Sequence, residues 1–257
     1  MTKLVSKHIL YDMMTPDLKA AENFYSKVIG WKIADAGMPD MSYSILSAGD
    51  VMVGGMMQTP KGDEGMQNPP RWHGHIYVPD VDGYTKQVKQ AGGKIHRDPA
   101  DIPGIGRFSV VSDPQGANFI MFKPNSNEEP KPVPANTPGH IGWHELHASD
   151  GKAAWNFYSK LFGWTKDRDL DMGQYGIYRI FATGGDAVGA VMTKMPDTPT
   201  PHWLYYFEVD AIDAAAARAT GAGGKIVMGP HQVPTNQWII QCTDPQGAAF
   251  AMVSFTR

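Results

Sequence analysis

The chain carries the stretch Asp17-Leu-Lys-Ala-Ala-Glu-Asn-Phe-Tyr-Ser-Lys-Val-Ile-Gly-Trp31 and repeats it as Asp150-Gly-Lys-Ala-Ala-Trp-Asn-Phe-Tyr-Ser-Lys-Leu-Phe-Gly-Trp164. A second repeat closes each half of the chain, as Asp113-Pro-Gln-Gly-Ala-Asn-Phe-Ile-Met121 and Asp244-Pro-Gln-Gly-Ala-Ala-Phe-Ala-Met252. The two repeats predict a duplicated fold. We therefore compare the polar residues that occupy equivalent positions in the two copies.

The duplication divides the 257 residues into two modules. Module one is predicted at 1–124 and module two at 138–257, joined by a proline-rich linker at 125–137. Each module is long enough to bury a hydrophobic core. The two modules therefore account for the whole chain.

Composition excludes several classes of partner. The net charge of −3 and the lack of basic runs argue against nucleic acid binding. The sequence contains no apolar stretch of about 18 residues, the length that a membrane span requires. The N-terminus has no apolar signal core, and Cys242 is the only cysteine. These features favour a cytoplasmic protein. A homodimer is left open, although the duplication already supplies one pairing of modules.

Each module has the same predicted order of strands and helices. The helices begin after Asp17 and Asp150, whose side chains can cap the first turn, and Asp-Pro-Gln-Gly favours a tight turn within a hairpin. Module one is predicted to contain strands His8–Met14, Tyr43–Ser47, Val51–Met57, Trp72–Val78, Arg107–Ser112 and Asn118–Lys123, with a second helix at Val81–Ala91. Module two is predicted to contain strands His140–Ala148, Tyr175–Ala182, Ala187–Thr193, Trp203–Val209, Trp238–Thr243 and Ala249–Phe255, with a second helix at Ile212–Ala219.

A strand, then Asp-x-x-x-Ala-x-x-Phe-Tyr-x-x-x-x-Gly-Trp, then an Asp-Pro-x-Gly hairpin resembles the vicinal oxygen chelate superfamily. This group includes glyoxalase I, bleomycin resistance proteins and extradiol dioxygenases, and the chain looks most like its two-module, glyoxalase-like branch. The resemblance implies an α+β fold of tandem paired βαβββ modules, whose curved mixed sheets surround a cavity for a small molecule. In the metalloenzymes of this superfamily, the cavity holds a divalent cation.

The resemblance also places four metal ligands in each module, and this chain lacks most of them. The first position falls on Leu10 and Trp143, and the second falls on stretches without an acid. The other two fall on His73 and Ile120 in module one, and on Leu204 and Ala251 in module two. Since three protein ligands are the usual minimum, we expect no metal and no cofactor.

Counting from the ligand positions that the resemblance implies, strand alternation predicts which side chains face the cavity. Besides apolar residues at those positions, they include Asp12, His73, His75, Tyr77 and Phe122 in module one, and Trp143, Glu145, His147, Tyr206 and Glu208 in module two. Asp12 and Glu145 are equivalent in the repeat. Asp12, Glu145 and His147 are the candidates for acid–base chemistry, although these acids could equally serve structure.

The leading hypothesis is a protein that binds a small organic molecule, apolar or aromatic, in a cavity without the usual metal ligands. Whether it is an enzyme is left open. One alternative is a metal-dependent lyase, isomerase or dioxygenase whose ligands have moved, either to His73, His75 and Asp12 or to Glu145, His147 and Glu208. Another is a signalling role in which the surface binds a protein partner.

Overall fold

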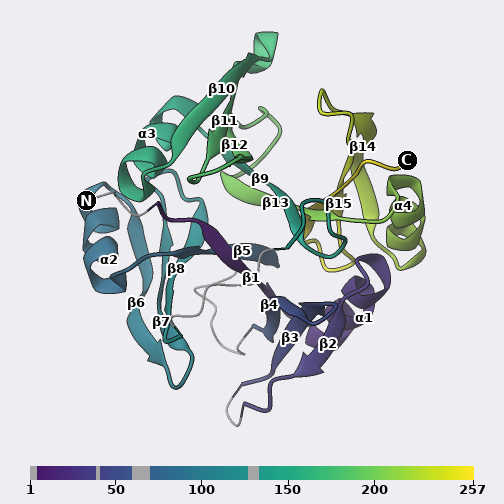
Figure 1. Ribbon diagram of the computed structural model, residues 1–257, viewed down its shortest axis with the longest axis horizontal. Helices are drawn as coiled ribbons and strands as arrows, with labels where there is room; N and C mark the ends of the chain where they lie inside the picture. The colour runs from purple at the N-terminus through teal and green to yellow at the C-terminus, as the bar shows by residue number, and fades with distance from the viewer. Residues whose placement is uncertain (1–4, 39–40, 60–69, 127–132) are drawn as a thin grey trace. The chain divides into compact units, whose positions relative to one another are not determined.

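The computed structural model describes residues 5–38, 41–59, 70–126 and 133–257, which form strands and helices in two matching series (Figure 1). The first series is β1 (His8–Thr15), α1 (Leu18–Val28), β2 (Lys32–Asp35), β3 (Tyr43–Ala48), β4 (Val51–Gln58), β5 (Arg71–Tyr77), α2 (Val81–Gln90), β6 (Lys94–Ile102), β7 (Gly106–Ser112) and β8 (Asn118–Pro124). The second series is β9 (Ile141–Ala148), α3 (Gly151–Phe162), β10 (Thr165–Asp171), the 3-10 turn η2 (Gly173–Tyr175), β11 (Ile177–Ala182), β12 (Ala187–Thr193), β13 (His202–Glu208), α4 (Ile212–Gly221), β14 (Lys225–Gln232), β15 (Trp238–Thr243) and β16 (Ala249–Ser254).

The strands form two eight-stranded mixed sheets. Their orders are β2-β3-β4-β1-β5-β8-β7-β6 and β10-β11-β12-β9-β13-β16-β15-β14. Each sheet also contains parallel neighbours, such as β1 with β4 in the first sheet and β13 with β16 in the second. The predicted α+β fold class is confirmed.

Several boundaries differ from the prediction. Strands β2, β6, β10 and β14 were not predicted. The sequences of β2 and β10 are polar, largely exposed and lack a regular alternation. Tyr175 was placed in a strand but lies in the turn η2. The prediction for the linker cannot be followed throughout, because 127–132 lie outside the described residues.

The chain forms two compact units, and each draws on both halves of the sequence. Unit 1 comprises 1–9, 73–131 and 144–203, and unit 2 comprises 10–72, 132–143 and 204–257. Unit 1 therefore holds α2 and α3, and unit 2 holds α1 and α4.

The repeated helix begins as predicted in both units. Asp17 accepts a hydrogen bond from the amide of Ala20, and Asp150 accepts one from the amide of Ala153. Each cap satisfies a backbone donor that the first helical turn leaves unpaired. The start of each helix is thus fixed by a single aspartate.

In unit 1 the helix of module two is bound to the hairpin turn of module one. Asp113 accepts hydrogen bonds from the amides of Gln115 and Ala117, both at 2.9 Å, and from the Tyr158 hydroxyl at 3.3 Å. The Trp203 indole nitrogen donates to that hydroxyl at 3.1 Å. Burial raises the pKa of the Asp113 carboxyl above its ordinary value, and the hydrogen bonds that the carboxylate accepts offset part of this rise. These buried groups join the two modules through satisfied polar contacts.

Unit 2 repeats this arrangement with the modules exchanged. Asp244 accepts from the amides of Gln246 and Ala248, both at 2.9 Å, and from the Tyr25 hydroxyl at 3.3 Å. The Trp72 indole nitrogen donates to the Tyr25 hydroxyl at 3.0 Å. The helix of module one therefore packs on the turn of module two.

The turn glutamines reinforce this crosswise docking. Gln115 accepts from the Asp150 amide at 2.7 Å and donates to the Asp150 carbonyl at 3.0 Å. Gln246 makes the same two bonds with Asp17, both at 2.9 Å. Each glutamine side chain thus pairs with the backbone of the residue that caps the helix. This contact explains the glutamine in the repeated sequence Asp-Pro-Gln-Gly.

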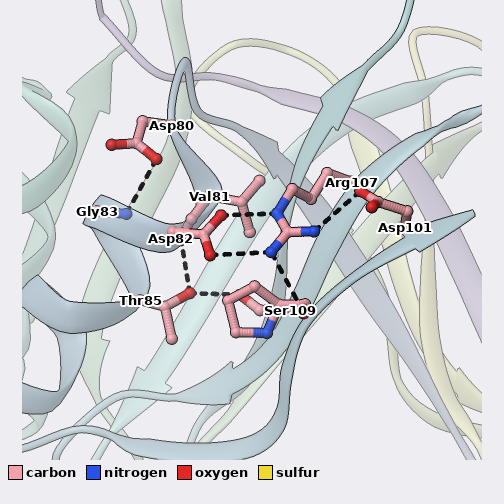
Figure 2. A network of polar contacts seen from close by, with 9 residues as sticks. Asp80, Val81, Asp82, Gly83, Thr85, Asp101, Arg107 and Ser109 are labelled. Carbon is pink, nitrogen blue, oxygen red and sulfur yellow. Dashed lines mark hydrogen bonds and ion pairs between the residues drawn. The ribbon is translucent and has the colours of Figure 1, made fainter.

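Helix α2 is fixed to the β6–β7 hairpin by a separate polar network in unit 1 (Figure 2). Arg107 on β7 donates from Nε and Nη2 to Asp82 at 2.6 and 2.9 Å, and from Nη1 to Asp101 at 2.9 Å. The Thr85 and Ser109 hydroxyls lie 2.9 Å apart beneath it. The two-point contact with Asp82 orients the guanidinium as well as attracting it.

No helix in the described part of the chain is long and apolar enough to cross a membrane. The predicted cytoplasmic location stays a prediction.

The parallel strand pairs require glycine where the backbones approach closely. In unit 1 a Cβ at Gly189 would overlap the carbonyl oxygen of His144, and in unit 2 a Cβ at Gly54 would overlap that of Tyr11. Gly185, by contrast, has open space at the position of a Cβ.

We predict that Gly189→Ala lowers the free energy of unfolding by about 1–3 kcal/mol, because a rigid carbonyl must move to admit the methyl group. Gly185→Ala, in the same unit, should change it by less than about 0.5 kcal/mol. Urea unfolding of both variants checks this. Equal effects at the two positions would contradict the close approach of β9 and β12.

Candidate functional site

A buried carboxylate–imidazole pair lies on strand β9 in unit 1. Glu145 Oε1 and His147 Nε2 are 2.7 Å apart, and the Tyr178 hydroxyl on β11 donates to Glu145 Oε2 at 2.6 Å. Glu145 is 6% exposed and His147 is 7% exposed. The predicted proximity of Glu145 and His147 is therefore found, and Tyr178 completes a three-member cluster.

The tautomer of His147 follows from the charge of its partner. With Glu145 ionised, its carboxylate can only accept, so the His147 Nε2 that faces it carries a hydrogen. In the neutral ring, His147 Nδ1 is then an acceptor. This nitrogen is buried, and no described residue donates to it. The cluster therefore presents one basic atom that its own members do not use.

A second imidazole lies flat against His147. The His202 ring on β13 is stacked at 4.9 Å between centroids and 1° between planes. Its Nδ1 is 3.0 Å from the Thr200 carbonyl oxygen, so that nitrogen donates. Tyr178 and His202 were not among the predicted site residues, and they lie on strands other than the one carrying the acid.

Module one contains the corresponding acid–tyrosine pair in unit 2. Tyr43 donates to Asp12 at 3.0 Å. Burial first, and the Asp12 charge second, raise the pKa of the Tyr43 hydroxyl. Comparison of the copies could have revealed Tyr178, because a tyrosine occupies this strand position in both.

The strand registers establish that the two pairs are equivalent. Asp12 and Ile45 both pair with Gly55, as Glu145 and Ile180 both pair with Ala190. Tyr43 and Tyr178 each lie two residues before these isoleucines. By the same register Met14 occupies the position of His147.

The two acid–tyrosine pairs differ at two positions, and at each of them the residue in module two is larger by one carbon. In unit 2 a Cβ at Gly55 would overlap the Tyr43 hydroxyl, so glycine lets the ring lie over β4 and reach a short aspartate. In unit 1 the equivalent residue is Ala190, and the acid is the longer Glu145. The extra methylene of glutamate offsets the added methyl group.

Unit 2 contains an apolar cluster where the resemblance places metal ligands. Leu204, Tyr206, Ala251 and Val253 form its buried centre, and the partly exposed Trp143 and Ile239 pack against it. Trp143, Leu204 and Ala251 are three of the four expected ligand positions. Neither an indole N–H nor an aliphatic side chain offers a lone pair to a cation, so this donor set does not fit a divalent metal.

Glu208 is buried at the end of β13 in unit 2. It is 2% exposed, and it pairs in register with Val253 of the apolar cluster. Burial raises the pKa of its carboxyl to about 7. Among the residues that the structure describes, none donates a hydrogen bond to this side chain, which explains why its charged form is disfavoured.

The remaining predicted residues lie in unit 1. His73 and His75 are each 7% exposed, and the His75 ring meets Phe122 edge-on at 5.6 Å. Tyr77 is partly exposed at the end of β5. Their role in ligand binding stays a prediction.

The proposed displaced metal sites each combine residues of both units. Asp12 belongs to unit 2 but His73 and His75 to unit 1, while Glu145 and His147 belong to unit 1 but Glu208 to unit 2. Within the described ranges, no three His, Cys, Asp or Glu side chains are grouped so as to hold a metal ion.

An open depression of about 670 Å³ lies between α1, β2 and β3 of unit 2. Polar side chains that line it are already hydrogen-bonded to other residues. Glu22 accepts from Lys19 and Ser44, and Tyr43 donates to Asp12. It is therefore a weaker candidate than the two buried clusters.

The profile of the Glyoxalase/Bleomycin resistance protein/Dioxygenase superfamily matches residues 6–121 and 138–252. The chain belongs to this superfamily. The predicted resemblance is thereby confirmed, and both repeats contribute to the match. The superfamily assignment does not by itself identify a ligand or a reaction.

Relatives within the superfamily carry different names. CFP32 of Mycobacterium tuberculosis, provisionally named a glyoxylase, is 34% identical over 94% of this chain and 92% of its own length. The anthracycline biosynthesis protein DnrV of Streptomyces peucetius is 29% identical over 95% of this chain and 91% of its own length. The structure of the Mn(II)-bound glyoxalase from Novosphingobium aromaticivorans covers 98% of this chain and 83% of that chain, with a TM-score of 0.67 at 18% identity. That likeness shows the fold alone.

The pKa of Glu208 predicts how stability depends on pH. Since the folded value of about 7 exceeds the ordinary 4.5, the unfolded chain loses this proton first as the pH rises. The free energy of unfolding should fall between these two values, by up to about 1.4 kcal/mol per pH unit. Glu208→Gln should remove this fall, whereas Asp50→Asn, at an exposed carboxyl, should preserve it. Parallel pH profiles for Glu208→Gln and the wild type would refute the assignment.

Proposed function

We propose that this protein binds a planar, largely apolar organic molecule at the apolar cluster of unit 2, without a divalent metal. The supporting observation is that Trp143, Leu204 and Ala251 come together where metal ligands are expected. A cation at these three positions would lose its water shell and gain no lone pair from their side chains in return. An apolar ring would instead gain roughly 25 cal/mol for each Å² of surface buried.

The margin of the cluster suits a flat ligand. Trp143 and Ile239 are partly exposed, and an indole favours stacking on other aromatic rings. The Tyr206 hydroxyl accepts from Gln241 at 2.8 Å, which fixes one polar group among the apolar ones. Glu208 adds a carboxyl that is neutral below pH about 7 and can then donate to a ligand oxygen.

The relatives suggest a suitable probe. DnrV is named for anthracycline biosynthesis, and anthracyclines contain a planar anthraquinone. A hydroxyanthraquinone therefore combines the ring system of that class with oxygens that a buried carboxyl could contact. We accordingly assign the ligand to the planar aromatic class.

The protein should bind 1-hydroxyanthraquinone equally well before and after treatment with EDTA. Trp143→Ala should weaken binding at least tenfold, because a large stacking surface is lost. Trp155→Ala, at a partly exposed tryptophan on α3 of unit 1, should leave binding unchanged. Calorimetry measures binding, and plasma mass spectrometry of the same samples measures metal.

Two results would refute this proposal. One is a stoichiometric metal whose removal abolishes binding of the probe. The other is binding that Trp143→Ala leaves at the wild-type affinity.

A further inference from the structure

We propose that the Glu145–His147–Tyr178 cluster of unit 1 is a proton-accepting site for planar molecules that bear an acidic hydroxyl group, such as electron-poor phenols and enols. This inference concerns unit 1 and stands apart from ligand binding at the apolar cluster of unit 2. The cluster would bind such a molecule through His147 Nδ1 and take up its proton.

The acid–tyrosine pair serves the fold in both modules. Tyr43–Asp12 and Tyr178–Glu145 occupy equivalent strand positions and make the same hydrogen bond. A contact present in both copies is explained by the sheet itself. It therefore cannot account for the imidazole that only one copy carries.

His147 is the group that distinguishes module two. Met14 occupies its position in module one, so the strand accommodates an apolar side chain there. A buried imidazole costs desolvation, and a buried acceptor that is left unsatisfied adds to that cost. An unneeded histidine would thus be unfavourable where the other copy has methionine, and a hydrogen-bonded ligand would offset this cost.

The surroundings of His147 suit a base. Glu145 faces Nε2 at 2.7 Å and would stabilise the imidazolium formed when Nδ1 gains a proton. Tyr178 holds the opposite oxygen of Glu145 at 2.6 Å, which fixes the direction of the carboxylate. His202 stacks on one face of the His147 ring, so a ligand would meet the Nδ1 lone pair in the plane of the ring.

The proton balance defines the class of ligand. The O–H bond of the ligand breaks, its electron pair stays on oxygen, and an N–H bond forms at His147 Nδ1. The imidazolium lies between two anions, the Glu145 carboxylate and the new phenolate, and the total charge is unchanged. Since imidazole ordinarily has a pKa near 6.5 and a simple phenol one near 10, an electron-poor hydroxyl gives the best match.

The test uses para-nitrophenol, which is yellow when ionised and nearly colourless when neutral. At a pH where the free probe is mostly neutral, with EDTA present, wild-type protein should bind it and turn it yellow. Para-nitroanisole, which lacks the O–H, should bind about tenfold more weakly or worse. His147→Met copies module one, and it should lose the yellow form and about tenfold in affinity. His231→Met, at an exposed histidine, should behave as wild type.

A measurement on the wild-type protein avoids any dependence on folding of the variant. Nitrogen-15 NMR of the histidine-labelled chain should show the Nδ1 of one ring becoming protonated as the probe binds. The proposal is overturned if wild-type protein binds the nitroanisole as tightly as the nitrophenol. It is also overturned if bound nitrophenol stays colourless, if His147→Met keeps the yellow form, or if no ring nitrogen becomes protonated.

Discussion

The fold depends on a buried hydrogen bond between a helix tyrosine of one module and a turn aspartate of the other. Tyr158 donates to Asp113 in unit 1, and Tyr25 donates to Asp244 in unit 2. Both tyrosines are fully buried, so each hydroxyl must find a partner inside the protein. The turn aspartate supplies that partner while it also caps its own loop.

The repeated stretch is thus largely a set of residues that face the other module. Its tryptophans follow the same rule, since Trp31 donates to the Gly139 carbonyl and Trp164 to the Ser6 carbonyl, both at 2.7 Å. These hydrogen bonds require the same backbone path in both copies. They do not restrict the side chains at other strand positions. Met14 and His147 show the result, because equivalent positions hold an apolar side chain in one copy and a basic group in the other.

Local chemistry made much of the fold predictable. Asp17 and Asp150 cap their helices because the cap needs only the nearby amides, and the equivalence of Asp12 and Glu145 followed from counting along the repeat. The exposed strands β2 and β10 lacked any alternation that could predict them. Tyr178 and His202 were missed because their roles depend on strand pairing, which the spacing of residues along one strand does not reveal. The crosswise docking could not be predicted for the same reason. Because the two turns have the same sequence, a helix could pack on the turn of its own module or on that of the other.

The most direct test of this account is a double-mutant cycle on Tyr158. Tyr158→Phe is combined with Asp113→Asn, its partner from the other module, and separately with Asp244→Asn from its own module, and urea unfolding gives each free energy. The account predicts a coupling of about 1 kcal/mol with Asp113 and none with Asp244. Coupling to Asp244 instead, or to neither residue, would contradict it.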